Sequence, residues 1–220
     1  MKKKKLLIVG GQGSGEIAMS TFKASNEKKL EWDICGYIND VVNPGEEFCG
    51  EKVLGGTESI IDWIDKGYYI HYTLHYNAKK KEERVKLFED LKIPKEAFAS
   101  AAHPLSYINQ DSVLGINTLL LPFSATSVGS VLGNHCHIYT SAFLGHDCKI
   151  GDFTTIAAHS IIGGRVKVLD GAHVGLNSTL REDIEIGEYS IIGMGSVVVK
   201  NVEKKTVVAG NPARFIKNLE

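Results

Sequence analysis

The sequence predicts two domains of different class, an N-terminal α/β domain and an all-β parallel β-helix. Residues 5–100 alternate strand-like and helix-like segments, whereas residues 114–203 repeat with a period of six. A six-residue period is the sequence signature of a β-helix. The 220 residues, 43% of them hydrophobic, are enough for two small cores. We therefore expect domains at 1–103 and 104–220.

The N-terminal region predicts a small parallel sheet with helices between its strands. Leu6 to Val9 form a continuous apolar run, as expected for a strand buried on both faces, and a glycine-rich turn and a helix follow it. Alternating strands and helices favour parallel pairing. The further strands are expected at 32–38, 53–55 and 68–74, and the further helices at 59–63 and at 79–91 with Val85, Leu87 and Phe88 inward.

Fifteen hexads run from Leu114 to residue 203 without insertion or deletion. An aliphatic residue opens 14 of the 15, with Thr126 the exception; glycine follows the opener in 8, and the fifth position is Ser, Thr, Ala or Cys in 12. Three hexads make one coil, so each opener points into an apolar axis and stacks on the opener three hexads later. We expect the glycines to supply positive φ at sharp corners and the small residues to fit the tight interior. One predicted ladder is Leu114, Leu132, Ile150, Val168 and Ile186.

The composition excludes several classes of function. The net charge is −1, and the basic runs Lys2–Lys5 and Lys79–Lys81 are short, which argues against nucleic-acid binding. No apolar stretch is long enough to span a membrane and no signal-peptide core is present, so we expect a cytoplasmic protein without membrane insertion. The cysteines show no CxxC spacing, so neither a disulfide framework nor a zinc site is expected; they are Cys35, Cys49, Cys136 and Cys148.

The glycine-rich turn, residues 10–15, is a candidate anion site. A turn of this kind before a helix offers free N–H groups and a positive dipole end to a phosphate. The spacing is not a strict GxGxxG, and about 100 residues is short for a dinucleotide fold, so a sugar nucleotide or another phosphorylated ligand is favoured over NAD. A purely structural turn is the alternative. Asp40 either accepts hydrogen bonds from a nucleobase or ribose, or serves as a turn residue.

His146 and Asp147 form the strongest catalytic candidate. They occupy the third and fourth positions of a hexad, which face outward, and a carboxylate beside an imidazole holds one tautomer and raises its basicity. The alternative is an exposed surface histidine, and periodicity alone does not choose among the hexad histidines. No metal site is expected, because His135 and His137 lack a third ligand at recognisable spacing. The other hexad histidines are His159 and His173.

The chain resembles the hexapeptide-repeat acetyltransferases, and within them the family of sialic acid O-acetyltransferases and nucleotide-amino-sugar N-acetyltransferases. The resemblance spans nearly the whole chain, and its most specific motifs are Gly145–Phe153 (GHDCKIGDF) and the closing Asn211-Pro212-Ala213. It implies that the N-terminal domain is Rossmann-like, that the β-helix is left-handed, and that the protein is a homotrimer using acetyl-CoA as cosubstrate.

The resemblance also implies roles for particular residues. His146 corresponds to the family's general base and Asp147 to its acidic partner. The N-terminal site would hold the sugar nucleotide, and acetyl-CoA would lie along the coils after the base. The implied substrate-binding residues are Gly11, Gly13, Ser14, Gly15, Asn39 and Asp40, and the implied acetyl-CoA-binding residues are Gly164, Gly193, Asn211, Pro212 and Ala213.

The sequence departs from the family pattern at three places, of which the second concerns the acetyl pocket and the third lies where the substrate would approach. Ser14 stands where many relatives have His, Thr154-Thr155 replace a second His, and His75-Tyr76-Asn77 replace a Gly-containing turn.

The function we expect is direct transfer of an acetyl group to a nucleotide-linked amino-dideoxy sugar, such as a 4-amino-4,6-dideoxyhexose, for bacterial glycans of the lipopolysaccharide O-antigen kind. The alternatives are O-acetylation of a sugar such as sialic acid, and a non-catalytic scaffold that binds nucleotide sugars.

Overall fold

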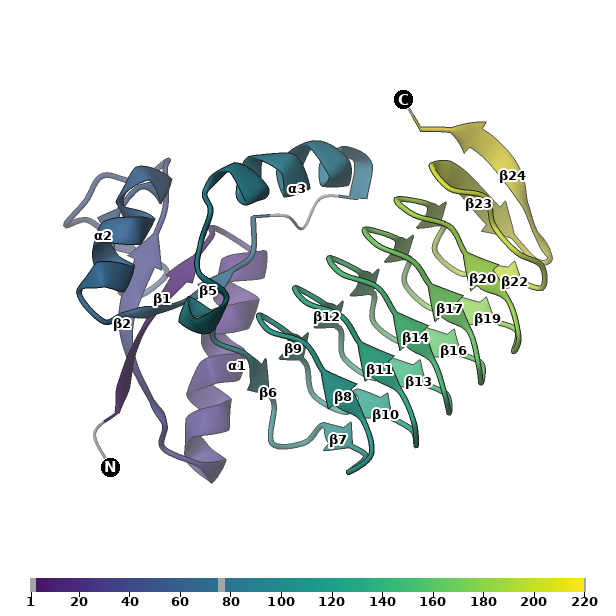
Figure 1. Ribbon diagram of the computed structural model, residues 1–220, viewed down its shortest axis with the longest axis horizontal. Coiled ribbons are helices and arrows are strands. Elements are labelled where there is room, and N and C mark those ends of the chain that lie inside the picture. Colours follow the sequence, from purple (N-terminus) through teal and green to yellow (C-terminus); the bar gives the residue numbers. More distant parts are fainter. Residues whose placement is uncertain (1–2, 75–77, 220) are drawn as a thin grey trace.

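The computed structural model describes residues 3–74 and 78–219, which form an α/β unit and a stack of triangular coils beside it (Figure 1). The predicted fold class is confirmed. The departure at residues 75–77 lies outside the described residues.

The N-terminal sheet has the strand order β3-β4-β2-β1-β5. Leu6 to Val9, on the interior strand β1 between β2 and β5, have no exposed surface, as the apolar run predicts. All neighbours pair in parallel except β3 and β4. The two-residue strand β3 was not predicted, because a segment so short has no periodicity. The strands are β1 (Lys4–Val9), β2 (Trp32–Ile38), β3 (Glu47–Phe48), β4 (Glu51–Gly55) and β5 (Tyr69–Tyr72).

Three α-helices accompany this sheet: α1 (Ser14–Lys28), α2 (Ile60–Asp65) and α3 (Lys81–Asp90). Short 3-10 turns lie at Thr57–Ser59, Ala78–Lys80 and Lys95–Ala97. On α3, Val85 and Phe88 are buried as predicted, but Leu87 is 59% exposed. The prediction for Leu87 was wrong, because a residue two positions from Val85 lies on the opposite side of a helix with 3.6 residues per turn.

The β-helix consists of three parallel sheets, one for each side of the triangle. The first contains β7 (Tyr107–Ile108), β10 (Ala125–Thr126), β13 (Phe143–Leu144), β16 (Ile161–Ile162), β19 (Thr179–Leu180) and β22 (Val197–Val198). The second contains β8 (Val113–Leu114), β11 (Val131–Leu132), β14 (Lys149–Ile150), β17 (Lys167–Val168) and β20 (Glu185–Ile186). The third contains β6 (Ala101–Ala102), β9 (Leu119–Leu120), β12 (His137–Ile138), β15 (Thr155–Ile156), β18 (His173–Val174), β21 (Ile191–Ile192), β23 (Thr206–Gly210) and the antiparallel β24 (Ala213–Asn218).

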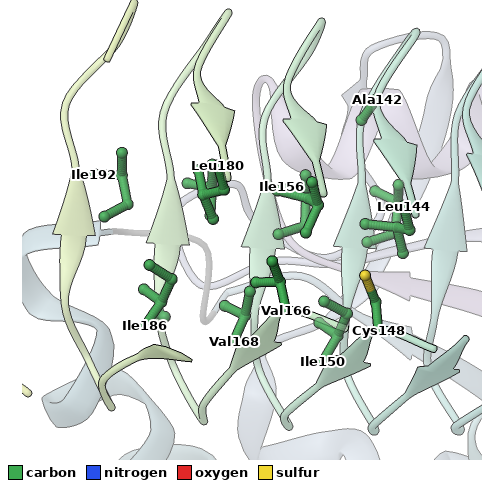
Figure 2. Packing of buried hydrophobic residues seen from close by; sticks show 14 of the residues in the cluster. Ala142, Leu144, Cys148, Ile150, Ile156, Val166, Val168, Leu180, Ile186 and Ile192 are labelled. Carbon is green, nitrogen blue, oxygen red and sulfur yellow. The ribbon is translucent and has the colours of Figure 1, made fainter. Parts of the chain in front are cut away.

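The hexad openers fill the axis, and Figure 2 labels Leu144, Ile150, Ile156, Val168, Leu180, Ile186 and Ile192 among them; the fifth-position residues Ala142, Cys148 and Val166 pack beside these openers. The predicted ladder from Leu114 to Ile186 is confirmed, since each member pairs with the next in register. The exceptional opener Thr126 is 1% exposed, and its hydroxyl accepts the Asn109 N–H at 3.1 Å and lies 2.8 Å from the Ser112 Oγ. A polar opener is tolerated there because its hydrogen bonds are satisfied.

The glycines of the repeat have a different role from the one predicted. None of the eight glycines after an opener has positive φ; the left-handed conformation falls instead at the fourth position, in all fourteen hexads from Asn117 to Gly195. A Cβ added to Gly163 would lie 2.6 Å from the Glu182 nitrogen of the next coil. The hexad glycines are therefore needed because successive coils approach closely at the corners.

The fifth-position side chains are buried in every hexad, and several of the polar ones join successive coils. The hydroxyls of Ser130, Ser160 and Ser178 donate to glycine carbonyls of the next coil, at 2.8–3.0 Å. Small hydrogen-bonding residues are thus favoured at this position because they fit the corner and satisfy a buried carbonyl.

The N-terminal unit covers the third sheet of the β-helix. His71 of β5 stacks on His137 of β12, with ring centroids 5.7 Å apart. Helix α3 lies over the same side, where the buried Lys81 ammonium donates to the Phe153 carbonyl and the Thr155 hydroxyl, each at 3.0 Å. Figure 1 shows α3 extending alongside the coils towards the C-terminal end. None of the helices in the described parts of the chain is long and apolar enough to cross a membrane.

Candidate active site

His146 lies at the corner that joins the first sheet to the second. Residues one coil apart stack along this corner, so the fourth positions of successive coils bring Gly129, Asp147, Arg165 and Asp183 into one column. The Arg165 N–H donates to the His146 carbonyl at 2.8 Å, which fixes one coil on the next. We call this column, with the third-position residues His146 and Gly164, the His146 corner.

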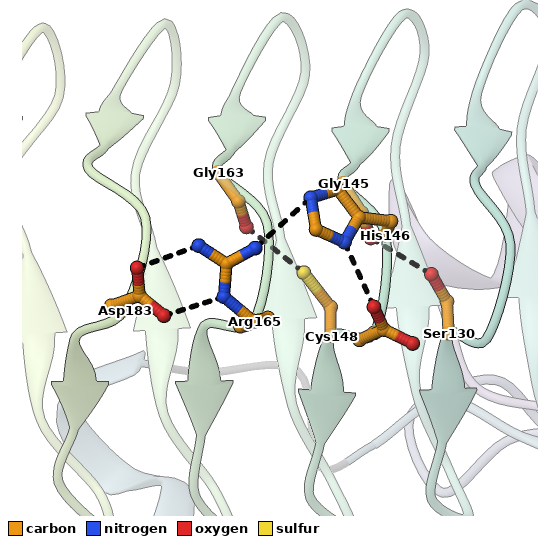
Figure 3. Close-up of polar contacts among 8 residues, drawn as sticks. Ser130, Gly145, His146, Cys148, Gly163, Arg165 and Asp183 are labelled. Atoms are coloured by element: carbon orange, nitrogen blue, oxygen red, sulfur yellow. Dashed lines mark hydrogen bonds and ion pairs between the residues drawn. The ribbon is translucent and has the colours of Figure 1, made fainter.

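The imidazole of His146 is held from both sides (Figure 3). Its Nδ1 lies 2.8 Å from Asp147 Oδ2, and its Nε2 lies 3.3 Å from Arg165 Nη1. The side chains of His146 and Asp147 are 46% and 61% exposed, so the ring is reachable from solvent. Because a carboxylate only accepts and a guanidinium only donates, these partners suit a neutral imidazole with its proton on Nδ1 and its lone pair on Nε2.

Arg165 is anchored by Asp183 on the next coil. Its Nε and Nη2 donate to the two carboxylate oxygens at 2.6 and 2.7 Å, a bidentate arrangement (Figure 3). Hydrogen bonding to Asp183 raises the pKa of the guanidinium, and hydrogen bonding from Arg165 lowers the pKa of the carboxyl. Neither residue belongs to a motif identified from the sequence. The signal that could have found them is their spacing from Asp147, which is one whole coil for Arg165 and two for Asp183.

Gly164, one of the residues that the resemblance implies for acetyl-CoA binding, lies directly against His146. A Cβ at this position would clash with the imidazole, the nearest atom being Nε2. Only glycine therefore leaves the imidazole its present place. The N–H of Gly164 donates no hydrogen bond within the described residues.

Cys148, two residues from His146, is not a suitable nucleophile. Its side chain is buried, and its thiol donates to the Gly163 carbonyl at 3.0 Å (Figure 3). Burial raises the pKa of this thiol to about 11, so the reactive thiolate is scarce at neutral pH.

The other hexad histidines are differently placed. His135 and His137 are buried under the N-terminal unit, and His159 is exposed at a different corner. Burial lowers the pKa of His135 to about 4 and that of His137 well below its usual value. Within residues 3–74 and 78–219, no group of three or more His, Cys, Asp or Glu side chains is arranged to hold a metal ion.

The glycine-rich turn has the predicted position between β1 and α1, but part of its anion-binding capacity is already used. The Gly13 N–H donates to the Glu16 carboxylate at 2.8 Å, and the Gly15 N–H to the Gly11 carbonyl at 2.9 Å. The Ser14 hydroxyl lies 3.3 Å from the Thr73 Oγ1. Glu16 was missed by the sequence reasoning, although a glutamate three residues after an N-cap is a common capping pattern. A phosphate at Gly13 would compete with this carboxylate.

Asn39 and Asp40 follow β2 on the same side of the sheet. The Asn39 amide donates to the Gly10 carbonyl at 3.0 Å and accepts the N–H groups of Val41 and Val42, so its side chain is committed to the fold. The Asp40 carboxylate accepts the Thr57 N–H at 2.6 Å. Asp40 also borders a cavity of about 480 Å³, whose other lining residues are Thr57, Tyr72, Leu74, Lys80, Glu83, Arg84, Leu87 and Leu91.

The implied acetyl-CoA residues fall into two groups. Gly164 belongs to the His146 corner, whereas Gly193 lies at the corner between the third and first sheets. There a Cβ on Gly193 would lie 2.7 Å from the Ala209 Cβ, close to the turn formed by Asn211, Pro212 and Ala213. The outer face of the first sheet separates the two groups. The third sheet, which the N-terminal unit covers, lies on a different side of the triangle from His146.

Comparisons with known proteins agree with this architecture. Residues 129–164, which include His146, match the family described as bacterial transferase hexapeptide (six repeats). The GDP-perosamine N-acetyltransferase of Escherichia coli O157:H7 is 27% identical over 164 residues, which are 74% of this chain and 73% of that protein.

Solved structures with the same two-part fold cover nearly the whole chain. The acetyltransferase domain of PglB from Neisseria gonorrhoeae, in complex with acetyl coenzyme A, has a TM-score of 0.82 at 21% identity and covers 98% of this chain and 100% of its own. PerB from Caulobacter crescentus, in complex with CoA and GDP-perosamine, has a TM-score of 0.82 at 20% identity and covers 97% of both chains. WeeI from Acinetobacter baumannii has a TM-score of 0.77 at 24% identity, over 97% of this chain and 100% of its own.

The repeat and the fold thus define the class: the chain is a hexapeptide-repeat protein with an α/β domain in front of its β-helix. Within that class, it is similar in sequence to the GDP-perosamine N-acetyltransferase of Escherichia coli O157:H7, and it shares its fold with PerB, the acetyltransferase domain of PglB and WeeI.

Proposed function

We propose that the protein is an acetyl-CoA-dependent N-acetyltransferase that acts on a nucleotide-linked amino-dideoxy sugar. Residues 1–103 would bind the nucleotide sugar and residues 104–220 would carry out the transfer. The observation that carries the proposal is His146, held between Asp147 and Arg165 on an exposed corner with Nε2 as the expected acceptor. The relatives support the substrate class, because one is named for GDP-perosamine and another binds it together with CoA.

The proposed chemistry is one acetyl transfer with one proton relay. The sugar amine attacks the thioester carbonyl while His146 Nε2 takes an amine proton. The C–S bond of the tetrahedral intermediate then breaks, and the proton returns to the sulfur of the leaving thiolate. The N–H of Gly164, which lies beside the ring and donates to no described group, is a candidate donor to the oxyanion.

A homotrimer is part of the proposal, because one chain does not bring its own groups together. The N-terminal unit covers the third sheet, whereas His146 lies between the first and second. The first sheet separates Gly164 from Gly193, and its outer face exposes apolar side chains, with Tyr107 62%, Phe143 40% and Ile161 41% exposed. A second copy on this face would cover them and bring Gly164 towards a neighbour's Gly193 and Asn211–Ala213 turn.

The oligomeric state is tested by light scattering coupled to size exclusion. One chain has a mass of 24.0 kDa, so a trimer gives three times that mass, whereas a 24.0 kDa species contradicts the trimer. Charged substitutions at Phe143 and Ile161 are expected to shift the mass towards the monomer and to abolish transfer together.

The reaction is tested with acetyl-CoA and a panel of UDP-, dTDP- and GDP-linked 4-amino-4,6-dideoxyhexoses, with free sialic acid as the hydroxyl acceptor. Product is detected by mass. We expect one nucleotide sugar to gain an acetyl group and His146→Ala to reduce its turnover by at least about a hundredfold. Turnover of sialic acid alone would indicate an O-acetyltransferase. Tight nucleotide-sugar binding without turnover would indicate a scaffold, and unchanged turnover in His146→Ala would remove His146 as the base.

A further inference from the structure

Arg165 makes a contact that no motif of the sequence assigns. Its Nη1 lies 3.3 Å from His146 Nε2, while its Nε and Nη2 bind both oxygens of Asp183 (Figure 3). The guanidinium cannot lose a proton and has no acceptor atom. It can therefore approach Nε2 favourably only when this nitrogen is unprotonated.

The two partners of the imidazole select the same state. Asp147 accepts from Nδ1–H at 2.8 Å, and Arg165 donates to Nε2. The carboxylate alone would stabilise an imidazolium as well as the neutral ring. A proton on Nε2 would face the Nη1–H of Arg165, whereas a lone pair there accepts from it, so the tautomer with a lone pair on Nε2 is the one that satisfies both neighbours.

We propose that Arg165 is a positioning residue of this site: anchored by Asp183, it holds the His146 imidazole in the orientation and tautomer that leave a lone pair on Nε2. The proposal rests on the proposed function of His146 as the base. It also implies a step of substrate binding, because the amine of the acceptor sugar must take the place of Arg165 Nη1 beside His146 Nε2. The two bonds to Asp183 use Nε and Nη2, so the guanidinium remains anchored while Nη1 gives up this contact.

Three successive coils build this arrangement. Asp147, Arg165 and Asp183 share the left-handed fourth position at φ 57°, 61° and 60°, which directs their side chains from the same corner. Gly164, immediately before Arg165, leaves the space that the imidazole occupies. Each part of the contact therefore comes from the regular stacking of one coil on the next.

A purely structural ion pair between the same coils provides the matched control. Lys167 and Glu185 lie two residues further along the same coils, with Nζ and Oε2 3.9 Å apart, and the pair faces out from the second sheet without contact to His146. If Arg165 serves only to join coils, Arg165→Gln and Lys167→Gln should behave alike.

The first experiment needs no substrate. Diethyl pyrocarbonate carbethoxylates unprotonated, accessible imidazole nitrogens, and peptide mass spectrometry reports the rate at His146 separately from the other histidines. We expect His146 in Arg165→Gln to react about threefold faster at pH 8, since Nε2 is no longer covered by the guanidinium. Arg165→Lys should fall between it and the wild type. Equal rates for wild type, Arg165→Gln and Lys167→Gln would overturn the proposal.

The second experiment uses acetyl transfer. In Arg165→Gln, we expect kcat to fall about tenfold with KM for the nucleotide sugar within about twofold, because the base is no longer held in place. Arg165→Lys should restore part of kcat, and Asp183→Asn, which removes the anchor of the guanidinium, should lower kcat by less than Arg165→Gln does. Normal kcat in Arg165→Gln would overturn the proposal. If the wild type acetylates no sugar, the proposed function fails, and the carbethoxylation rates still decide the role of Arg165.

Discussion

Histidines enclosed between the α/β unit and the β-helix make the folded chain sensitive to acid. His71 is fully buried, with its Nδ1 2.9 Å from the Ala99 carbonyl, and burial lowers its pKa from 6.5 to about 4. His135 is 5% exposed among Phe88, Phe98 and Phe153, and burial lowers its pKa to about 4 despite the opposing charge of Asp152. Because these histidines bind protons at a higher pH in the unfolded chain than in the folded one, the stability present above pH 6.5 is lost as pH falls towards 4.

The magnitude follows from these pKa values. For one histidine with a pKa of 6.5 unfolded and about 4 folded, linkage gives a loss of about 2 kcal/mol between pH 7.5 and pH 5. His71 and His135 together should contribute about 4 kcal/mol to this loss, a large part of the roughly 5–15 kcal/mol typical of folded domains. His137 and His173, whose pKa values burial also lowers, add to it. Urea unfolding at pH 7.5 and pH 5, at one protein concentration, measures the total loss.

His135→Phe isolates one half of the effect. Phe123 and Phe153 already adopt the same left-handed fourth position, at φ 62° and 56° beside 58° for His135, so the backbone accepts the change. In this variant, the difference in the free energy of unfolding between pH 7.5 and pH 5 should be about 2 kcal/mol smaller than in the wild type. His159→Phe, at an exposed fourth position with φ 60°, is the control and should retain all of it. Equal wild-type stability at the two pH values, or full pH dependence in His135→Phe, would refute the reasoning.

Three further predictions concern the coils. Gly163→Ala should lower the free energy of unfolding by more than about 2 kcal/mol, because the added Cβ would lie 2.6 Å from the next coil, whereas Gly195→Ala, at φ 67° with open space around it, should lower it by about 1 kcal/mol. Urea unfolding of both variants measures these losses. The reverse order would contradict close approach as the reason for the hexad glycines. Ile150→Ala should cost about 2–5 kcal/mol by leaving a cavity in the axis, measured in the same way, and a loss below about 1 kcal/mol would contradict tight axial packing. Cys148→Ser should retain acetyl-transfer activity within about threefold, because serine can keep the hydrogen bond to the Gly163 carbonyl. Loss of activity with intact folding would argue for a covalent intermediate.

The sequence predicts the β-helix well because its signal repeats. Fifteen hexads in one register leave little freedom for the axis, and the structure extends the same register back to Ile108 and Ala102, whose strands were not predicted. Those two hexads are harder to recognise because neither has glycine after its opener, and the first opens with Ala102 rather than a larger aliphatic residue. The role of the hexad glycines was misassigned because a sequence does not distinguish a residue chosen for its φ from one chosen for lack of a Cβ.

The candidate site was predictable where its residues are neighbours in the chain. His146 and Asp147 are adjacent, so their pairing is visible in the sequence. Arg165 and Asp183 join them through the stacking of coils, which becomes visible only when the sequence is written with one coil to each row. At the glycine-rich turn, hydrogen bonds within the fold occupy Asn39 and the N–H of Gly13, and a pattern of residue types does not reveal such competition.

The regular coil gives each side chain of the β-helix two coordinates, an angle and a height. Two residues one coil apart have the same angle around the axis of the β-helix and differ by one coil in height along it, as Asp147, Arg165 and Asp183 do in succession. Inserting or deleting a whole coil would therefore change the height of later residues and leave them facing the same way, whereas a change of one hexad would turn every later residue to the next side of the triangle. One side faces the α/β unit, one exposes apolar residues, and the third carries Lys149, Lys167 and Glu185 beside Val113 and Val131, so whole coils are the units in which such a chain can lengthen without exchanging these surfaces.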